Sequence, residues 1–175
     1  MSEDPALLLA VALIAGFEGF DSVPYRDAGR GIWTYGYGFI TTPDGHPVTE
    51  QTPPITRAAA DTRLAADVSK VVASVRAMIY VPISSNAVAA LVSFAWNEGT
   101  GALRKSSIMR MLNAGDPADA ARYFDSYVFA GGKRLDGLVS RRAAEAALFL
   151  RPDGAEITVA GSTDDLNARE LASLK

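Results

Sequence analysis

Two carboxylates in the first part of the chain, Glu18 and Asp27, are candidates for acid and base chemistry. Cleavage of a glycosidic bond needs one carboxylic acid that protonates the leaving oxygen, and a second carboxylate that activates water or stabilises the cationic sugar. Glu18 follows twelve apolar or small residues, surroundings that favour a neutral acid, whereas Asp27 lies in a glycine-flanked segment where an ionised carboxylate is natural. Two carboxylates nine positions apart are common, and composition alone favours a helix end and a turn cap over a catalytic pair.

The segments around these carboxylates predict a helix followed by a small hairpin lobe. Asp4 and Pro5 are a good helix start, because aspartate caps free amides and proline fits the first turn. The helix should run over residues 5–17 and place Glu18 at its end. Over residues 29–49, aromatic and β-branched residues alternate with glycines and a turn follows at 43–45, so we expect a hairpin lobe over about 20–55.

The rest of the chain predicts helices that would form a larger lobe. A long helix over 56–78 should connect the two lobes, because its apolar residues recur at helical spacing and its charged residues occupy the other face. Start and stop signals predict four more helices, over 84–96, 106–113, 118–128 and 138–150. We expect one domain over residues 1–153, and a polar tail over 154–175 with one surface helix near 164–173.

Composition excludes several classes of function. The chain has no cysteine and a single histidine, His46, which argues against disulfides, zinc clusters and Ser-His-Asp chemistry. The net charge of −3 gives no global attraction to nucleic acid or to an anionic membrane. The apolar run over residues 6–17 is too short for a membrane span, which needs about 20 residues, and no basic residues precede it. We therefore expect a buried helix.

The segment from Glu18 to Gly38 resembles the signature of phage lysozymes, glycoside hydrolase family 24. The matching residues are Glu18-Gly19-Phe20, Tyr25-Arg26-Asp27 and Trp33-Thr34-Tyr35-Gly36-Tyr37-Gly38. The resemblance implies Glu18 as the general acid, Asp27 as the carboxylate that positions or activates water, and Thr34 as a hydroxyl that holds water. Six residues separate Asp27 from Thr34 where the family has five, so Arg30 or Gly31 reads as an insertion.

Two later blocks are similar to the same family. Residues 91–101, followed by Ser106-Ser107-Ile108, match a region that forms one wall of the family's cleft, which implies Trp96, Asn97 and Ser107 as sugar contacts. Core packing is an equal alternative for Trp96. Residues 137–145 match a Gly-Leu, Arg-Arg, Glu pattern, which implies that Arg141 pairs with and orients Glu18. Arg142 and Glu145 are also explained by an ordinary ion pair on a helix surface.

Together these blocks imply a two-lobed α+β fold, lysozyme-like, that cleaves the β-1,4 bond between N-acetylmuramic acid and N-acetylglucosamine. The resemblance further implies inverting hydrolysis without a metal or organic cofactor, by a monomer that serves host cell lysis. Such a protein should accumulate in the host cytoplasm and reach the periplasm and cell wall after membrane permeabilisation.

Three alternatives remain open at the level of sequence. A lytic transglycosylase would cleave the same bond with one acid and no water-activating partner, and Asp27 and Thr34 argue against it. A non-catalytic wall-binding module would not need both carboxylates and the arginine. A nucleic-acid binder would use the basic second half of the chain, namely Arg104, Lys105, Arg110, Lys133, Arg134, Arg141 and Arg142. The net negative charge argues against this last class.

Overall fold

The computed structural model of the chain describes residues 4–27 and 31–154. Its elements are, in chain order, α1 (Pro5–Glu18), β1 (Asp21–Arg26), β2 (Trp33–Gly36), α2 (Arg57–Arg76), α3 (Ser85–Glu98), α4 (Thr100–Lys105), α5 (Ser107–Asn113), α6 (Pro117–Arg122), the 3₁₀ helix η1 (Tyr123–Ser126), β3 (Phe129–Ala130), β4 (Lys133–Arg134) and α7 (Asp136–Phe149).

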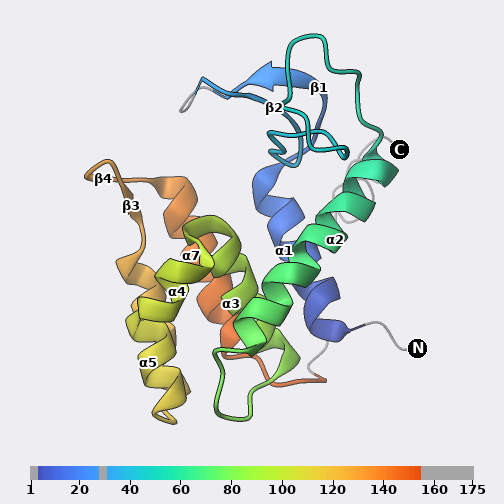
Figure 1. Cartoon of the computed structure of the whole chain (residues 1–175). Helices are drawn as coiled ribbons and strands as arrows, with labels where there is room; N and C mark the ends of the chain where they lie inside the picture. The colour runs from blue at the N-terminus through green and yellow to red at the C-terminus, as the bar shows by residue number, and fades with distance from the viewer. Residues whose placement is uncertain (1–3, 28–30, 155–175) are drawn as a thin grey trace, which may run out of the picture.

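The molecule has two lobes that a long helix connects (Figure 1). β1, β2 and the turns after them form the small lobe at one end, and α3 to α7 form the larger helical lobe. α2 runs from the small lobe along the helical lobe, and its 20 residues span about 30 Å. The predicted α+β architecture, with a hairpin lobe, a helical lobe and a connecting helix, is confirmed.

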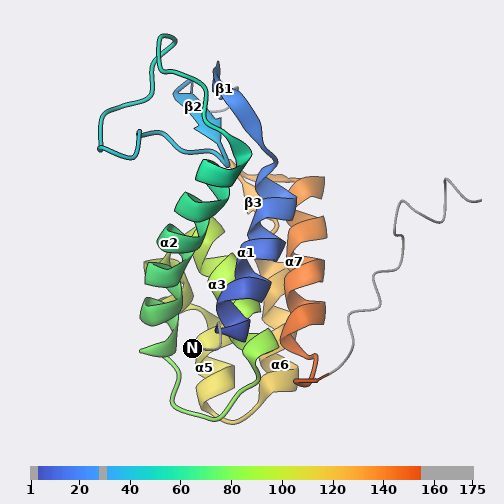
Figure 2. The ribbon, with the colours of Figure 1, turned by 90° about the vertical axis from the view of Figure 1, so that its right-hand side faces the viewer.

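α3 is the central helix of the larger lobe, and every residue from 86 to 95 in it is buried. A helix that is apolar on all sides must be surrounded by other elements. α3 contacts α1, α2 and α7, and Figure 2 shows α1 between α2 and α7. α3 therefore fixes the position of the first helix of the chain relative to the last one.

In the small lobe, β1 and β2 form an antiparallel pair in which Tyr25 lies opposite Thr34. The chain turns between Asp27 and Ile32, where the Asp27 amide donates a hydrogen bond to the Ile32 carbonyl at 2.9 Å. The first strand thus precedes residue 29, where we predicted the extended segment to begin. Pro24 explains the difference, because proline lacks a ladder donor and the register of β1 shifts between residues 21 and 25.

After β2 the chain folds into turns instead of further strands. Tyr35 and Phe39 form an isolated bridge, and the predicted turn at 43–45 is present, with the Gly45 amide donating to the Thr42 carbonyl at 3.0 Å. Tyr35, Tyr37 and Phe39 are buried and provide the core of this lobe. The small lobe is therefore held together by aromatic packing more than by sheet pairing.

Two arginines of α2 fasten the small lobe to the connecting helix. The guanidinium of Arg57 lies 4.2 Å from the ring centre of Phe20, and that of Arg63 lies 4.1 Å from the ring centre of Phe39. Arg63 Nη2 also donates to the Thr41 hydroxyl at 3.0 Å. A guanidinium stacked on an aromatic face contributes about 0.5–2 kcal/mol, depending on how far it is desolvated.

The buried phenol of Tyr37 makes a third connection to α2. It donates to Asp61 Oδ1 at 2.6 Å and accepts from Arg57 Nη1 at 2.9 Å. The hydrogen bond to Asp61 raises the pKa of Tyr37, and desolvation acts in the same direction. The phenol therefore stays neutral and keeps this connection at any physiological pH.

The predicted helices over 56–78, 84–96, 106–113 and 138–150 are confirmed as α2, α3, α5 and α7. The predicted helix over 118–128 is shorter, because α6 ends at Arg122 and η1 follows, where Phe124 packs 5.6 Å from the ring of Phe94. None of the helices within 4–27 and 31–154 is long and apolar enough to cross a membrane. The helix predicted near 164–173 lies outside the described residues.

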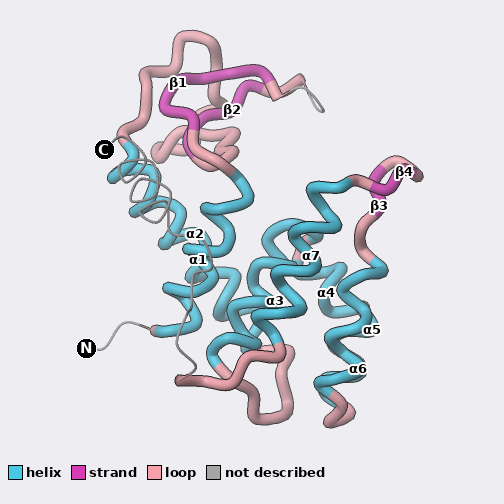
Figure 3. Tube along the Cα trace, turned by 180° about the vertical axis from the view of Figure 1, so that it is seen from behind, coloured by secondary structure: helices cyan, strands magenta, loops and turns pink. Residues whose placement is uncertain are grey.

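Two elements were not predicted, α4 and the β3–β4 hairpin, which Figure 3 shows at the edge of the helical lobe. The hairpin has two residues in each strand. Gly131 and Gly132 form its turn with φ of 57° and 76°, a conformation that favours glycine. A glycine pair between two predicted helices is also an ordinary break between them, so it did not predict a hairpin.

A substitution of Gly36, at the end of β2, tests how tightly the small lobe is packed. Its φ is 62°, and a Cβ placed there would lie 2.7 Å from Cδ2 of the buried Phe39 ring. We expect Gly36→Ala to lower the free energy of unfolding by about 2–3 kcal/mol, measured by urea denaturation. Gly16→Ala in α1 is the matched control, because a Cβ there meets no atom within 4 Å. It should raise stability by about 0.5–1 kcal/mol, and equal effects of the two substitutions would contradict the prediction.

Candidate active site

Glu18 is the last residue of α1, and the sequence determines this position at both ends of the helix. Asp4 caps the start, with its Oδ1 accepting from the Ala6 amide at 3.1 Å, and Pro5 occupies the first turn. Gly19 ends the helix with φ of 70°, a value that favours glycine. The Glu18 carboxylate therefore projects from the end of a packed helix, with 26% of its side chain exposed.

Asp27 and Thr34 come from the hairpin of the small lobe. Asp27 directly follows β1, and its carbonyl accepts from the Gly31 amide at 2.7 Å, which closes the turn. Thr34 is buried in β2, and its hydroxyl is 3.4 Å from the carbonyl of Tyr25 on the opposite strand. Arg30, one of the two residues interpreted as an insertion, lies outside the described residues.

Glu18, Asp27 and Thr34 line one cavity of about 200 Å³ between the end of α1 and the small lobe. Its full lining is Glu18, Tyr25, Asp27, Ile32, Thr34, Gly38 and Ile40. The structure thus brings together the three residues for which the family resemblance implies catalytic roles. A cavity of about 390 Å³ at the far end of the helical lobe has no carboxylate among its described lining residues.

Gly38 brings the backbone of the small lobe close to the carboxylate of Glu18. Its φ is 84°, and a Cβ there would lie 4.0 Å from Glu18 Oε2. Oε2 of Glu18 thus lies near Gly38, which lines the cavity. The other oxygen, Oε1, has a partner in the helical lobe.

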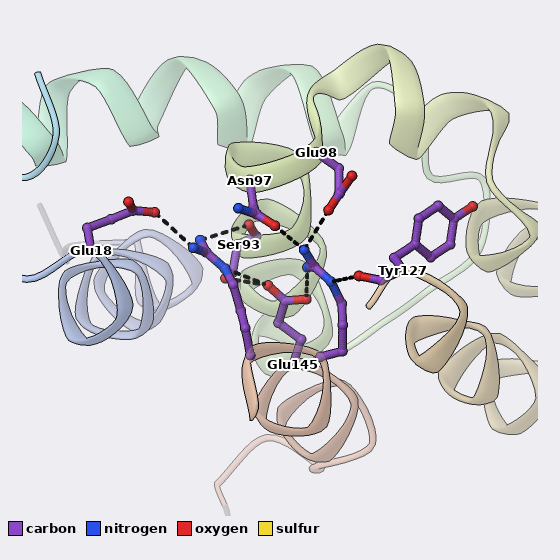
Figure 4. A network of polar contacts seen from close by, with 8 residues as sticks. Glu18, Ser93, Asn97, Glu98, Tyr127 and Glu145 are labelled. Carbon is purple, nitrogen blue, oxygen red and sulfur yellow. Dashed lines mark hydrogen bonds and ion pairs between the residues drawn. The ribbon is translucent and has the colours of Figure 1, made fainter. Parts of the chain in front are cut away.

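That partner is Arg141, whose Nη1 donates to Glu18 Oε1 at 2.8 Å (Figure 4). Only 6% of the Arg141 side chain is exposed, and its guanidinium lies 5.4 Å from the ring centre of Phe17. The apolar surroundings expected for Glu18 are therefore only part of its environment, because a buried cation lies against one of its oxygens. The contact joins residues 123 positions apart in the chain.

Arg141 belongs to a buried polar network between α7 and α3. Figure 4 shows Glu18 at one end, Tyr127 at the other and Glu145 between them. Glu145 Oε1 accepts from Arg141 Nε at 3.3 Å and from the Ser93 hydroxyl at 2.7 Å, and Glu145 Oε2 accepts from Arg142. Arg142 is also bound to Asn97, Glu98 and the Tyr127 carbonyl.

The interpretation of Arg142 and Glu145 as an ordinary surface ion pair is wrong. Both side chains are completely buried, and they connect α7 to α3. Breaking a buried pair costs about 3–5 kcal/mol, against a few tenths for an exposed pair on a helix. Burial raises the pKa of Glu145, while the charge of Arg142 and the hydrogen bond from Ser93 oppose the rise.

The three residues proposed as sugar contacts lie outside the cavity of Glu18. Trp96 is half-buried and packs against the hydrophobic core. Asn97 accepts a hydrogen bond from Arg142, and the Ser107 hydroxyl accepts one from Arg110 Nη2 at 3.0 Å. Their roles as sugar contacts stay predictions.

The basic second half of the chain is not one continuous surface patch. Arg141 and Arg142 are buried in ion pairs, so two of the seven cations cannot meet an anionic partner. Arg104, Lys105 and Arg110 line a separate open groove on α4 and α5.

Sequence reasoning missed Glu145 and Ser93 as part of the site. The signal was present in the helical spacing: Arg141, Arg142, Glu145 and Phe149 fall on one face of α7, and Phe149 is apolar. Charged residues on the face that carries a core phenylalanine indicate a buried polar network instead of a solvated surface.

Comparisons with known proteins agree on one family. The sequence model described as phage lysozyme matches residues 15–145, a range that includes every residue of the cavity and the network. An endolysin of Bacillus phage B103 is 35% identical over 149 residues, which are 85% of this chain and 55% of that protein. The chain spans about half the length of such curated relatives.

Solved structures show the same similarity. The endolysin from Escherichia coli O157:H7 phage FAHEc1 superposes with a TM-score of 0.73 and 36% identity, covering 81% of this chain and 90% of that one. The muramidase domain of SpmX from Asticaccaulis excentricus gives a TM-score of 0.70 and 32% identity, covering 82% and 95%.

Proposed function

Since this chain belongs to the phage lysozyme family, we propose that it is a muramidase, which hydrolyses the β-1,4 bond between N-acetylmuramic acid and N-acetylglucosamine in peptidoglycan. The observation that carries the proposal is the cavity in which Glu18 of α1 meets Asp27 and Thr34 of the small lobe. It supplies two carboxylates from different elements on one site, which is what glycosidic hydrolysis needs.

Glu18 is the general acid in this mechanism. Arg141 holds Oε1 at 2.8 Å, which fixes the orientation of the carboxyl group and leaves Oε2 for substrate. The proton of Glu18 passes to the glycosidic oxygen while the bond from that oxygen to C1 of the muramic acid breaks. The N-acetylglucosamine side then departs with a neutral hydroxyl group.

Asp27 takes up a proton from the attacking water, whose oxygen forms the new bond to C1. Thr34 helps to hold this water, because its hydroxyl donates toward the Tyr25 carbonyl at 3.4 Å and keeps lone pairs that can accept a hydrogen bond. Attack from the face opposite the leaving group inverts the configuration at C1. One water is consumed, and a new reducing end appears.

The biological role that follows is degradation of the host cell wall for lysis by a phage or prophage, carried out by a monomer without a nucleic-acid partner. The route to the wall stays a prediction: accumulation in the host cytoplasm, followed by passage into the periplasm when the membrane is permeabilised.

Mass spectrometry of the fragments released from purified sacculi tests this function. Digestion in water enriched in ¹⁸O should give muropeptides with reducing-end muramic acid that carry one ¹⁸O, because hydrolysis adds the oxygen of water to C1. Glu18→Gln digested in parallel is the negative control.

Two other results would each reject hydrolysis. Anhydromuramic ends without ¹⁸O would identify a lytic transglycosylase, in which the sugar's own hydroxyl attacks C1. Binding to sacculi without any released fragment would identify a non-catalytic wall-binding module.

A further inference from the structure

The ion pairs behind Glu18 contain more negative than positive groups. Glu18 and Glu145 contact Arg141, while Glu145 and Glu98 contact Arg142. Three carboxylates thus share two guanidiniums, which leaves one negative charge in excess when all are ionised. A single proton on one carboxylate makes the network neutral.

Arg141 divides its charge between two carboxylates on opposite sides. Its Nη1 is 2.8 Å from Glu18 Oε1, and its Nε is 3.3 Å from Glu145 Oε1. Because 6% of the Arg141 side chain and none of the Glu145 side chain is exposed, little solvent screens the interaction between them. The more Arg141 is neutralised by Glu145, the less it favours the ionised form of Glu18.

The guanidinium contacts of Glu145 favour its ionised form. Both of its oxygens face donors, namely the guanidiniums of Arg141 and Arg142 and the hydroxyl of Ser93. A guanidinium has no lone pair that could accept a hydrogen bond from a protonated carboxyl group. The two cations thus oppose the burial that disfavours the charge of Glu145.

We propose that Glu145 is a positioning residue whose negative charge, acting through Arg141, sets the pH above which Glu18 stops serving as the proton donor. The inference rests on the proposed function for its catalytic meaning. It assigns to Glu145 the task of offsetting the charge of Arg141, which also fixes the orientation of the acid.

The other charged and titratable groups around Glu18 and Glu145 lie on α7, α3 and the small lobe. Arg141 faces Glu18 from α7, while Tyr25 and Asp27 line the same cavity from the small lobe. Glu145 faces Arg141 and Arg142 on its own helix and meets the hydroxyl of Ser93 on α3. Glu145→Gln removes none of these groups but turns one oxygen into an NH2 donor beside a guanidinium, so its effect on Glu18 is compared with that of the double variant with Arg142→Met.

Glu145→Gln is the direct test, read as the rate of muropeptide release against pH. Activity falls on the alkaline side when Glu18 loses its proton. Without the charge of Glu145, the full charge of Arg141 acts on Glu18. We therefore expect the alkaline limb of the pH–rate profile, the range in which activity falls as pH rises, to move to lower pH by about one unit. Arg141→Gln removes the cation itself and should move the limb to higher pH.

Glu98→Gln is the matched control. Glu98 contacts Arg142 at 2.9 Å and lies one ion pair further from Glu18. The Glu98→Gln substitution should therefore move the alkaline limb of the pH–rate profile by less than a third of the shift in Glu145→Gln. Should Glu145→Gln alone fail to fold, Glu145→Gln combined with Arg142→Met removes both members of the buried pair. Such a replacement is often tolerated, and the same shift is expected.

A second readout separates this inference from the proposed function. The ¹³C chemical shift of the Glu18 carboxyl group, followed against pH by NMR, reports its titration without substrate. We expect the midpoint to fall in Glu145→Gln and to rise in Arg141→Gln. If the midpoint in Glu145→Gln stays within about 0.2 units of the wild type or rises, the inference is wrong, whether or not the protein releases muropeptides.

Discussion

Replacing Glu18 by glutamine is expected to reduce the rate of muropeptide release by about 10²- to 10⁴-fold, the usual contribution of a positioned general acid. Glutamine keeps an oxygen that accepts from Arg141 Nη1, so the geometry at the end of α1 is preserved while the transferable proton is lost. Arg141 also remains paired with Glu145, which avoids an unpaired buried cation. The loss should therefore be one of catalysis and not of folding.

Turbidity clearing of outer-membrane-permeabilised cells measures this rate, and thermal unfolding checks the fold. Glu50→Gln is the matched control, because Glu50 is an exposed residue of the small lobe outside the cavity. It should clear cells at the wild-type rate. A Glu18→Gln protein that keeps more than a tenth of the wild-type rate would show that the proton comes from elsewhere.

Replacing Asp27 by asparagine is expected to reduce hydrolysis by a similar factor, about 10²- to 10⁴-fold. Asparagine has nearly the same shape as aspartate but cannot take a proton from water. This substitution also separates the mechanisms, since a lytic transglycosylase needs the acid alone and would keep most of its rate.

The release of labelled reducing ends from sacculi is the appropriate measurement for this second variant. Asp44→Asn provides a matched control in the same lobe, because 68% of the Asp44 side chain is exposed and it lies outside the cavity. Unchanged hydrolysis in Asp27→Asn would remove Asp27 from the mechanism, even with Glu18→Gln inactive.

Local rules were sufficient to predict the helix that carries Glu18. The cap at Asp4, the proline after it and the glycine at position 19 all act on their nearest neighbours, and the structure has the corresponding hydrogen bond and φ value. The strand that leads to Asp27 was missed because Pro24 and a shift of register interrupt the pattern that indicates a strand. The residue at which β1 begins is therefore determined by its pairing with β2 and not by a local signal.

The spacing of Glu145 from its two arginines does not by itself indicate burial; the apolar Phe149 on the same face of α7 does, but it does not identify the partner on α3. Three and four positions separate it from Arg142 and Arg141, which is also the spacing of an exposed ion pair. What decides between the two is the position of α3, which brings Ser93 to within 2.7 Å of the carboxylate. Such a contact over 52 residues is a property of the tertiary fold.

The three predicted sugar contacts depend on the family resemblance alone. The resemblance assigned Trp96, Asn97 and Ser107 to the cleft wall, and the structure gives each of them a partner within the protein. A sugar hydroxyl would have to displace these partners before it could bind at the cleft wall.

The pairing of Glu18 with Arg141 constrains the order in which a ribosome can produce a working protein. Glu18 is synthesised before the cation that orients it, which follows 123 positions later. At about 5–20 residues per second, several seconds of translation separate the two. A nascent chain that ends before α7 therefore contains the cavity residues without the arginine that orients the acid, and the three cavity residues and Arg141 can come together only after α7 has been synthesised.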